Sequence, residues 1–407
     1  MAELKISNFG PIKSGFNEKS DGFFEINKYT IIVGDQGTGK STIAKIFSTF
    51  CWLEKAFERK YYNELSFSDF TDLCAYQRLP KEYFIETTIL AYKGIAFEFI
   101  VEKKNFYFKK LNDKDYICPK IIYIPSERNV VSVLEDLDQI KNIPKVIKDF
   151  KSELKKANLN LKKYSRTHIF NYEIFYDNSK DLNFIKEESN DEKIPLTSAS
   201  SGLQSIVPLF LVTDYLFQFL QSPILERINS MNVANQEFIL NNIKDLHLMA
   251  NVKLYLSSNI TKNFTQDDIS TLEKDFSKYV DSSFINIVEE PELNLFPATQ
   301  IRIIEGLISH NCLKGSKLFI TTHSPYILSA MNNFIYANEI FQNKHKLVDE
   351  IPEKYLVNIK DVSAYKTENG KIINIKDNKC NLIDSDSIDE CSSKINEIYS
   401  KLMDIGE

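Results

Sequence analysis

The sequence predicts an α/β fold built around a parallel β-sheet, and three observations lead to this prediction. A β-branched apolar run, 30–33, is followed by a glycine-rich loop and then by a helix over 41–47. Two further apolar runs, 284–288 and 317–322, have the length of buried strands, and each ends in charged or polar residues. Open α/β sheets bind ligands at the carboxyl ends of their strands, so a ligand site is expected at these tips.

The glycine-rich loop reads Gly-Asp-Gln-Gly-Thr-Gly-Lys-Ser over 34–41 and matches the G-x-x-x-x-G-K-[ST] pattern of a nucleotide phosphate loop. Glycines let backbone N–H groups wrap phosphate oxygens, and the following helix N-terminus adds a favourable dipole. The residues expected to hold the phosphates are Gly34, Gly37, Thr38, Gly39, Lys40, Ser41 and Thr42. Lys40 is expected to face the ligand rather than the core and to reach the β- and γ-phosphates, while the Ser41 hydroxyl ligates Mg²⁺.

The tips of the other two strands carry candidate reactive groups. Glu289 and Glu290 follow the run 284–288, and beside a phosphate loop one should hold the Mg²⁺ shell and the other should orient the attacking water. The alternative is a charged turn before a helix. His323 follows the run 317–322 and is a candidate γ-phosphate sensor, although a lone histidine is more often structural.

Local patterns predict the remaining elements. Alternation over 83–109 predicts an antiparallel meander. Residues 121–124 predict another buried parallel strand, and its tail, 125–128, carries two charges that either meet the nucleotide or form a surface turn. A hairpin around Asn369-Gly370 and a terminal helix over 387–403 complete the prediction.

Composition and charge narrow the classes of function. With 43% hydrophobic and 26% charged residues, the chain can bury a sizeable core. A net charge of −6 argues against bulk attraction to nucleic acid or anionic membrane. Residues 141–166 are locally basic, with nine Lys or Arg against two acids, and form either a solvated helix face or a contact with nucleic acid or an acidic partner.

The cysteines and the apolar runs indicate a compartment. The six cysteines are scattered, without a C-x-x-C pair, which predicts reduced thiols in a cytoplasmic protein. The N-terminus lacks the build of a secretory signal. The longest apolar run, 206–220, is interrupted by Pro208, Asp214 and Gln218, so no membrane span is predicted.

A final segment, 197–204, places Ser201 and Gly202 before the apolar run 205–220 and could form a second anion-binding helix terminus. Four motifs follow one another in the chain: the phosphate loop, Ser-Ser-Gly-Leu-Gln, a strand followed by Glu-Glu-Pro-Glu, and a strand followed by Thr-His-Ser-Pro. Together they resemble the ABC-type ATPase superfamily, and they look closest to its soluble branch of RecF, SMC-like and OLD-type ATPases. The resemblance covers most of 1–335. It implies a P-loop NTPase fold with an ABC-ATPase head, in which a mixed RecA-like sheet is joined by an antiparallel β meander and helical insertions.

In such ATPases each nucleotide lies between the phosphate loop of one subunit and the signature segment of another, so the resemblance implies a homodimer or higher oligomer that hydrolyses ATP. Carried over to this chain, Glu289 is the Mg²⁺-associated acid, Glu290 the general base and His323 the switch. Ser201 and Gly202 would close the site of the other subunit.

Three further positions qualify the resemblance. Asn294 falls in the segment that family members use for contact across the dimer, and Leu203 stands where the family has a glycine. The Mg²⁺-side acid, Glu289, is a glutamate where an aspartate is usual. Both departures imply slow hydrolysis, which suits a switch more than a motor.

The resemblance also suggests a biological role. OLD-type nucleases carry a metal-binding TOPRIM domain after the ATPase, whereas the residues after His323's helix lack its acidic pattern, so the nuclease is expected to be absent. Stand-alone ATPases of this kind resemble those of bacterial anti-phage modules, in which ATP-driven assembly controls a separate nuclease or toxin. The alternatives are a DNA maintenance ATPase like RecF, which clamps DNA, and a scaffold that binds ATP without hydrolysing it.

Four segments are expected along the chain. The N-terminal part of the head, with the phosphate loop and meander, spans 1–128, and a basic helical insertion with a polar connector over 171–195 spans 129–195. The segment 196–345 carries the signature helix, a helical insertion over 221–280, the acidic strand tip and the switch histidine. A hairpin and helix over 346–407 close the head.

Overall fold

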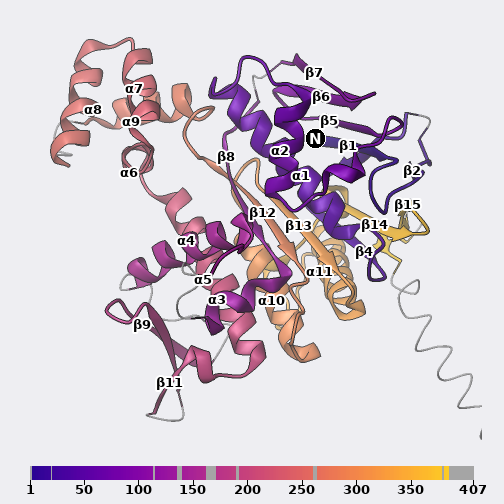
Figure 1. Cartoon of the computed structure of the whole chain (residues 1–407). Coiled ribbons are helices and arrows are strands. Elements are labelled where there is room, and N and C mark those ends of the chain that lie inside the picture. The colour runs from indigo at the N-terminus through magenta and orange to yellow at the C-terminus, as the bar shows by residue number, and fades with distance from the viewer. Residues whose placement is uncertain are drawn as a thin grey trace, which may run out of the picture.

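The computed structural model describes residues 2–19, 21–112, 115–134, 140–161, 171–188, 192–259, 264–377 and 380–384. These residues form a mixed α/β structure with several sheets, and helices cover both faces of the largest one (Figure 1).

The largest sheet has seven strands and a mostly parallel core. Across the sheet, the strands are β2 (Gly15–Phe16), β15 (Lys371–Asn374), β14 (Val362–Glu368), β4 (Tyr29–Gly34), β13 (Lys317–Thr322), β12 (Ser283–Glu289) and β8 (Pro119–Ile124). The five strands from β14 to β8 are parallel, and β15 pairs antiparallel with β14. Because β12 is buried along its whole length and β4 and β13 nearly so, they read as continuous apolar runs. The four strands predicted from such runs and the late hairpin are confirmed.

A second sheet is antiparallel and contains the predicted meander. Its strands, in order, are β3 (Phe24–Ile26), β1 (Ala2–Ser7), β5 (Ile89–Lys93), β6 (Phe97–Glu102) and β7 (Asn105–Lys110). In β6, Phe97, Phe99 and Val101 are buried while the residues between them are not, which is the period-two pattern of a half-buried strand.

The helix α1 (Lys40–Glu58) packs between these two sheets. Phe47 stacks on Phe319 of β13 with ring centroids 5.1 Å apart, and Phe50 stacks on Tyr92 of β5 at 5.5 Å. A single hydrophobic cluster therefore joins the helix to both sheets. The shorter helix α2 (Phe67–Tyr76) packs beside α1 and starts with a capping box formed by Ser66 and Asp69.

The opposite face of the large sheet is covered by a second hydrophobic cluster, to which four helices contribute. They are α4 (Lys145–Asn160), α5 (Ser201–Gln221), α10 (Pro297–Ser309) and α11 (Pro325–Lys344). By length and composition α5 is the one helix among the described residues that could cross a membrane, but more than half of its most apolar window is buried in this structure. Such burial is typical of a core helix.

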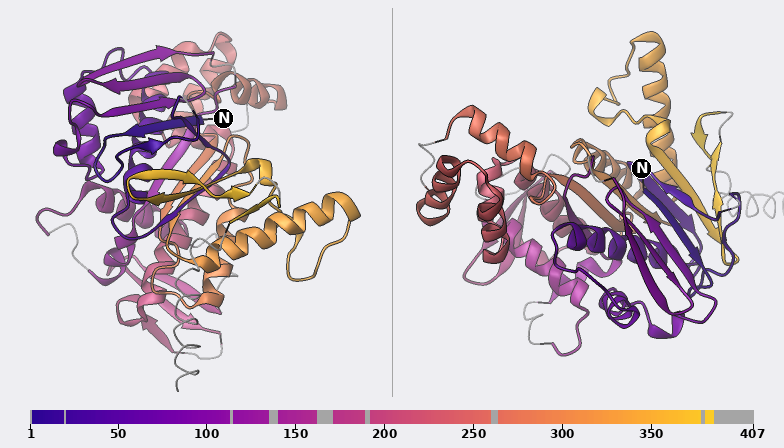
Figure 2. Two further views of the ribbon diagram at one scale, coloured as in Figure 1. Left: turned by 90° about the vertical axis from the view of Figure 1, so that its right-hand side faces the viewer. Right: turned by 90° about the horizontal axis from the view of Figure 1, so that it is seen from above.

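The segment 221–280 is helical, as predicted. Its helices are α6 (Ile224–Asn229), α7 (Val233–Asn242), α8 (Leu246–Ser258) and α9 (Gln266–Phe276). They share a hydrophobic cluster of their own and project away from the sheets (Figures 1 and 2). The Arg227 guanidinium ties the insertion to the large sheet by donating to the Asp281 carbonyl and the Ser282 hydroxyl, each at 2.8 Å.

The prediction of a polar connector over 171–195 is wrong. The structure has a three-stranded antiparallel sheet there, formed by β9 (Tyr172–Asp177), β10 (Leu182–Glu187) and β11 (Lys193–Pro195). Ile174 and Ile185 pair across β9 and β10 and are buried in the second cluster. On the opposite face the paired Phe175 and Phe184 alternate with charged residues such as Glu173 and Lys186, and this mixture obscured the strand pattern.

The remaining described elements are short. They are α3 (Val130–Val133), β16 (Lys376–Asp377), β17 (Leu382–Ile383) and the 3-10 turns η1 (Lys81–Tyr83), η2 (Ser126–Asn129), η5 (Leu196–Ser198), η6 (Glu353–Tyr355) and η7 (Ile359–Asp361). The terminal helix predicted over 387–403 lies outside the described residues.

Candidate functional site

The tips of three neighbouring parallel strands lie at one edge of the large sheet. In the register of the sheet, Val33 of β4 pairs with Thr322 of β13, and Thr321 pairs with Glu289 of β12. The phosphate loop, His323 and Glu290 each follow one of these strands directly. The fold therefore brings these strand tips together at one edge of the sheet.

The phosphate loop has the backbone geometry that its glycines allow. Gly37 and Gly39 have φ values of 76° and 109°, in the left-handed region that side chains disfavour. A Cβ on Gly39 would lie 2.6 Å from Ile12 Cδ1, whereas a Cβ on Gly37 would meet nothing within 4 Å. The backbone is thus closely packed behind Gly39 and open around Gly37, where a phosphate could approach.

Strand β14 supports the loop from its other side. The hydroxyls of Thr38 and Thr367 are 2.7 Å apart, Thr38 donates to the Asp35 carbonyl at 2.7 Å, and the Thr367 hydroxyl donates to the Val33 carbonyl at 3.2 Å. A residue near the end of the described chain therefore shapes the loop. Of the other predicted loop residues, Ser41 is partly exposed and Thr42 is buried.

Lys40 is buried, contrary to the expectation that it faces only ligand. Lys40 is 5% exposed, and its Nζ donates to the carbonyls of Gly34 and Asp35, both at 2.8 Å. Burial lowers the pKa of the Lys40 ammonium, while the neighbouring carboxylates, first Glu290, oppose that effect. The loop's own carbonyls provide a partner for the cation that the sequence pattern does not reveal.

His323 lies between Lys40 and Glu290. Its Nδ1 is 3.5 Å from Lys40 Nζ and its Nε2 is 3.4 Å from Glu290 Oε1. An ionised carboxylate can only accept, so His323 Nε2 is the donor toward Glu290. The hydrogen bond with His323 is the main reason that the pKa of Glu290 is lowered. The Glu290 and His323 side chains are partly exposed, so water can reach the carboxylate.

Glu290 is held in a strained backbone conformation. Its φ is 44°, which is uncommon for a residue with a side chain, and its N–H donates to the Thr321 carbonyl at 2.8 Å. Arg128 holds the turn that contains Glu289 and Glu290 by donating to the carbonyls of both residues, each at 2.8 Å. The side chain that should orient water is thus held by a rigid turn.

The two charges of the tail 125–128 differ in exposure, because the Glu127 side chain is partly exposed and pairs with Arg78, whereas Arg128 is not an exposed turn residue. It is fully buried, and besides the two carbonyls at the acidic turn it donates to the Ser205 carbonyl of α5 at 3.1 Å. Burial lowers its pKa to about 10. The sequence analysis singled out the residue but not this positioning role, since its partners are distant in the chain.

Glu289 has a free acceptor that fits a metal ion. The residue is 3% exposed, and Oε2 accepts the Ser126 N–H at 3.3 Å. The other oxygen, Oε1, is buried without a hydrogen-bond partner in the part of the chain that the structure describes. A buried carboxylate oxygen in this state is a suitable ligand, direct or through water, for Mg²⁺.

Glu292 is a site residue that the sequence analysis did not assign. Its Oε1 accepts the Thr322 hydroxyl at 2.8 Å and the His323 N–H at 2.7 Å, which fixes the tip of β13 to the acidic turn. Burial raises the pKa of the Glu292 carboxyl. The signal was present as the third acid of Glu-Glu-Pro-Glu, but only the fold shows which backbone it holds.

Ser201 and Gly202 belong to a different surface. They start α5, where the Ser200 hydroxyl caps the helix, and a Cβ on Gly202 would lie 2.9 Å from the Asn294 carbonyl. Asn294 has a φ of 62°, and its amide donates to the Ser205 hydroxyl at 3.4 Å. Gly202 therefore lies against Asn294 and Leu295 rather than against the phosphate loop.

Comparisons with known proteins gave matches among solved structures only. The chain is similar to the SMC head domain from Thermotoga maritima, with 10% identity, coverage of 91% of this chain and 96% of that chain, and a TM-score of 0.36. It is also similar to an SMC head bound to the C-winged helix domain of ScpA, with 11% identity, 93% and 98% coverage and a TM-score of 0.37. A third is the SMC head domain with an extended coiled coil bound to the C-terminal domain of ScpA from Pyrococcus furiosus, at 10% identity, 98% and 100% coverage and a TM-score of 0.36.

No family model and no curated protein matches the chain. Structural likenesses as distant as these carry no argument about activity or partners.

Proposed function

We propose that this chain is an ATPase of the ABC type that works as a nucleotide-dependent switch. The observation that carries the proposal is the line from Lys40 through His323 to Glu290, which joins the tips of three adjacent parallel strands. A phosphate-loop lysine, a polar sensor and a carboxylate that water can reach are the groups that phosphoryl transfer to water needs.

Each group has a defined part in the proposed reaction. The loop N–H groups and Lys40 bind the phosphates, and Ser41 and Glu289 hold Mg²⁺, which when bound neutralises charge on the β- and γ-phosphates. Glu290 accepts a proton from the attacking water. His323 links the position of the Lys40 ammonium to that of the Glu290 carboxylate, so it can report the presence of the γ-phosphate.

The signature residues fit a site completed by a second copy of the chain. Ser201, Gly202 and Asn294 form one surface, and the phosphate loop with His323 and Glu290 forms another. If two copies associate, the surface with Ser201 of each copy would face the phosphate loop of the other copy. ATP would then lie between the two copies. In this proposal the head comprises 1–128 and 196–345, closed by 346–407.

The proposed output of the switch is control of a separate effector, such as the nuclease or toxin of an anti-phage module. The helical insertion supports it as a docking element, because it has an independent core and exposes large apolar side chains. These are Val233, Leu246 and Leu254. Exposed apolar side chains on a projecting subdomain are suited to protein contact.

The test of the ATPase is the variant Glu290→Gln. The amide keeps the shape of the side chain but cannot accept the proton, so turnover should fall by about 10²- to 10³-fold or more while ATP–Mg²⁺ binding persists. Glu102→Gln, on the exposed end of β6, is the matched control and should turn over like the parent protein. Unchanged phosphate release by Glu290→Gln would exclude Glu290 as the base, and absence of ATP binding by the parent protein would exclude the ATPase.

A DNA-clamping function is the second candidate, and exposed lysines on α4 favour it. Lys145, Lys148 and Lys155 are exposed on this helix, within the basic segment 141–166. If they contact phosphates, Lys148→Glu with Lys155→Glu should weaken DNA binding and reduce its dependence on salt. Lys103→Glu, on the β6–β7 turn, is the control. Equal binding by both variants would leave the effector switch as the only candidate.

A further inference from the structure

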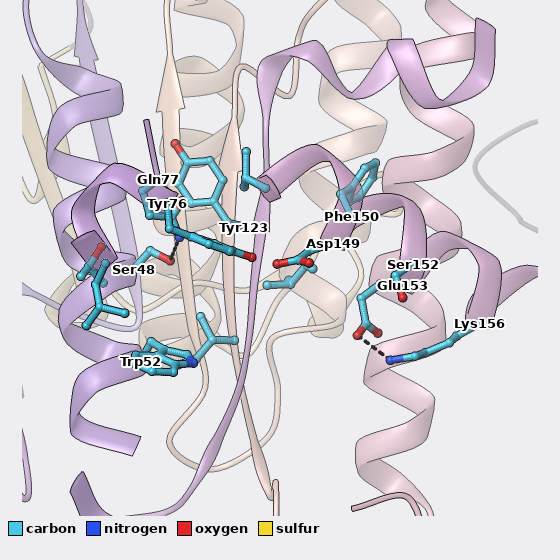
Figure 3. Close-up of a pocket in the computed structure, with 15 residues that line it drawn as sticks. Ser48, Trp52, Tyr76, Gln77, Tyr123, Asp149, Phe150, Ser152, Glu153 and Lys156 are labelled. Atoms are coloured by element: carbon cyan, nitrogen blue, oxygen red, sulfur yellow. Dashed lines mark hydrogen bonds and ion pairs between the residues drawn. The ribbon is translucent and has the colours of Figure 1, made fainter. Parts of the chain in front are cut away.

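A pocket of about 500 Å³ lies away from the phosphate loop, between α1, α2, β8 and α4 (Figure 3). Ser48, Thr49 and Trp52 line it from α1, eight to twelve residues beyond Lys40, which is about 12–18 Å along a helix. In Figure 3, Trp52 and Gln77 lie on one side, and Asp149 and the other α4 side chains lie on the other. The nucleotide site proposed above does not use this cavity.

Two residues that line the pocket have a buried acceptor without a partner among the described residues. Gln77 is 9% exposed, and its Nε2 donates to the Ser48 hydroxyl at 3.5 Å, but its Oε1 is buried with no hydrogen bond to any described residue. Glu153 is in the same state: Oε1 accepts from Lys120 and Lys156, and Oε2 is buried and unpaired within the described chain. Unpaired buried acceptors are costly, and a ligand that donates hydrogen bonds would relieve that cost.

The charge of the pocket is nearly balanced, which restricts the ligand. Glu153 forms ion pairs with Lys120 at 3.1 Å and Lys156 at 2.9 Å, so its negative charge is already compensated. Asp149 supplies one more carboxylate. A neutral donor therefore fits the interior better than an ammonium or guanidinium group would.

Aromatic walls and a basic rim define the rest of the ligand. Trp52 is 39% exposed and lines the pocket together with Tyr76, so flat apolar surface is available for stacking. The rim is formed by α4, where Lys145 places Nζ 5.9 Å from the Tyr76 ring and Lys156 lines the cavity itself. A ligand with a planar base inside and an anionic group at the rim satisfies both features.

We propose that this pocket binds a nucleobase that carries an exocyclic amine, with its phosphate held by the lysines of α4. The amine would donate to Gln77 Oε1, and the ring would stack against Trp52 or Tyr76. Adenine, cytosine and guanine have such an amine, whereas uracil does not. The base can come from a free nucleotide or from a single strand, since both present a base attached to a phosphate.

Trp52 makes the test direct, because it is the only tryptophan of the chain. Its fluorescence is followed while the full chain with Lys40→Met, which removes the phosphate-loop cation, is titrated with AMP, CMP, GMP or UMP. We expect saturable quenching by the first three and weaker binding of UMP. A parallel titration with a short single-stranded adenine oligonucleotide identifies the source: tighter binding of the oligonucleotide assigns the pocket to nucleic acid, and tighter binding of AMP assigns it to free nucleotide.

Two variants in the same background separate the pocket from other surfaces. Gln77→Met keeps the side-chain volume and removes the unpaired acceptor, so affinity should fall about tenfold without loss of stability. Lys156→Ala should also weaken binding, whereas Lys103→Ala, on the exposed turn between β6 and β7 that does not line the pocket, should not. Thermal melting checks that each variant is folded.

The proposal is overturned if no monophosphate or oligonucleotide gives a saturable change, or if Gln77→Met binds like its parent. Quenching seen in the wild-type chain and abolished by Lys40→Met would also overturn it, because the ligand would then occupy the phosphate loop. The outcome is independent of the ATPase assignment, which depends on Glu290 and not on this pocket.

Discussion

At the scale of single residues, Arg128 has the most demanding position, a fully buried cation whose partners are backbone carbonyls. These carbonyls belong to the acidic turn and to Ser205 of α5, so the side chain joins the turn that follows β12 to the beginning of α5. A buried charge is stable only when its hydrogen bonds are complete. The guanidinium therefore makes the geometry of the acidic turn dependent on the start of α5.

We predict that Arg128→Met unfolds more easily than the parent protein by about 3–5 kcal/mol, because several charge-assisted hydrogen bonds are lost together and the carbonyls become unpaired. Urea unfolding at neutral pH measures this free energy. Arg78→Met is the matched control, since Arg78 forms an exposed pair with Glu127 and should cost less than about 1 kcal/mol. Equal costs for the two variants would contradict the role given to Arg128.

Lys40 leads to a second prediction. Lys40→Met should lose ATP–Mg²⁺ binding by about 10²-fold or more, because the phosphates lose their principal cation. Its free energy of unfolding should change little, since the variant also removes a desolvated charge from among the carbonyls of Gly34 and Asp35. Calorimetric titration and urea unfolding give the two quantities. ATP bound as tightly as by the wild-type chain would refute the assignment of the loop.

The contrast between these residues explains which parts of the site could be predicted. The phosphate loop, Glu290 and His323 directly follow apolar strands. Neighbouring residues in the sequence therefore predict both their chemistry and their place on the sheet. The partners of Arg128 lie up to 163 residues away, and the carbonyls that hold Lys40 are backbone atoms common to every sequence. Neither arrangement has a local signature.

At the scale of elements, helix α1 is fixed at its far end by an ion cluster. Lys55 Nζ and Arg59 Nη2 donate to Asp281 Oδ1 at 2.6 and 2.7 Å, and Asp281 lies just before β12. Burial, the largest influence, raises the pKa of Asp281, but the two cations outweigh it and hold the pKa at about 2. The cluster thus ties the phosphate-loop helix to the strand that carries Glu289 and Glu290.

The sign of the pH dependence follows from that pKa. The folded-state value of about 2 is below the ordinary 3.8, so the unfolded chain binds the proton more readily. The stabilisation by Asp281 is complete above about pH 4 and is lost as the pH falls toward 2. We predict that Asp281→Asn lowers the free energy of unfolding at pH 7 by at least about 2 kcal/mol. The variant should also lose less of this free energy than the parent protein when the pH falls from about 4 to 2, as urea unfolding between pH 2 and 7 would show. If the variant lost as much free energy of unfolding between about pH 4 and 2 as the parent protein, other carboxylates would be responsible for the acid sensitivity.

Elements also differ in how clearly the sequence marks them. The strands β4, β12 and β13 were predictable because burial on both faces requires uninterrupted apolar runs. The small sheet of β9 to β11 was not, because a few buried residues such as Ile174 and Ile185 are enough to attach it to the core.

At the scale of the whole molecule, the proposed site needs two copies of the chain. We predict that Glu290→Gln accumulates as an ATP-bound dimer, because ATP that is not hydrolysed stays held from both sides. Adding Ser201→Arg should prevent this accumulation while leaving ATP binding by a single chain intact, since the new side chain occupies the surface where the second copy approaches. Light scattering with and without ATP measures the mass.

A double variant that still forms the ATP-dependent dimer would exclude a site shared through Ser201. If the chain is an oligomer without ATP, the mass cannot report the change, and radiolabelled ATP retained through gel filtration replaces it. Retention by Glu290→Gln and loss in the double variant is the expected result.

The order of the strands has a consequence for how the protein is made. Strand β4, which leads into the phosphate loop, lies between β13 and β14, and Thr367 of β14 contacts Thr38 of the loop from 329 residues further along the chain. A ribosome adding roughly 5–20 residues per second needs about 15–65 s to cover that distance. For most of this time β4 has neither of its neighbours in the sheet, because β13 is made only shortly before β14. The nascent chain therefore cannot complete the packing of its phosphate loop before Thr367 has left the ribosome. A product truncated before β13 would present β4 as an unpaired apolar strand to chaperones and proteases.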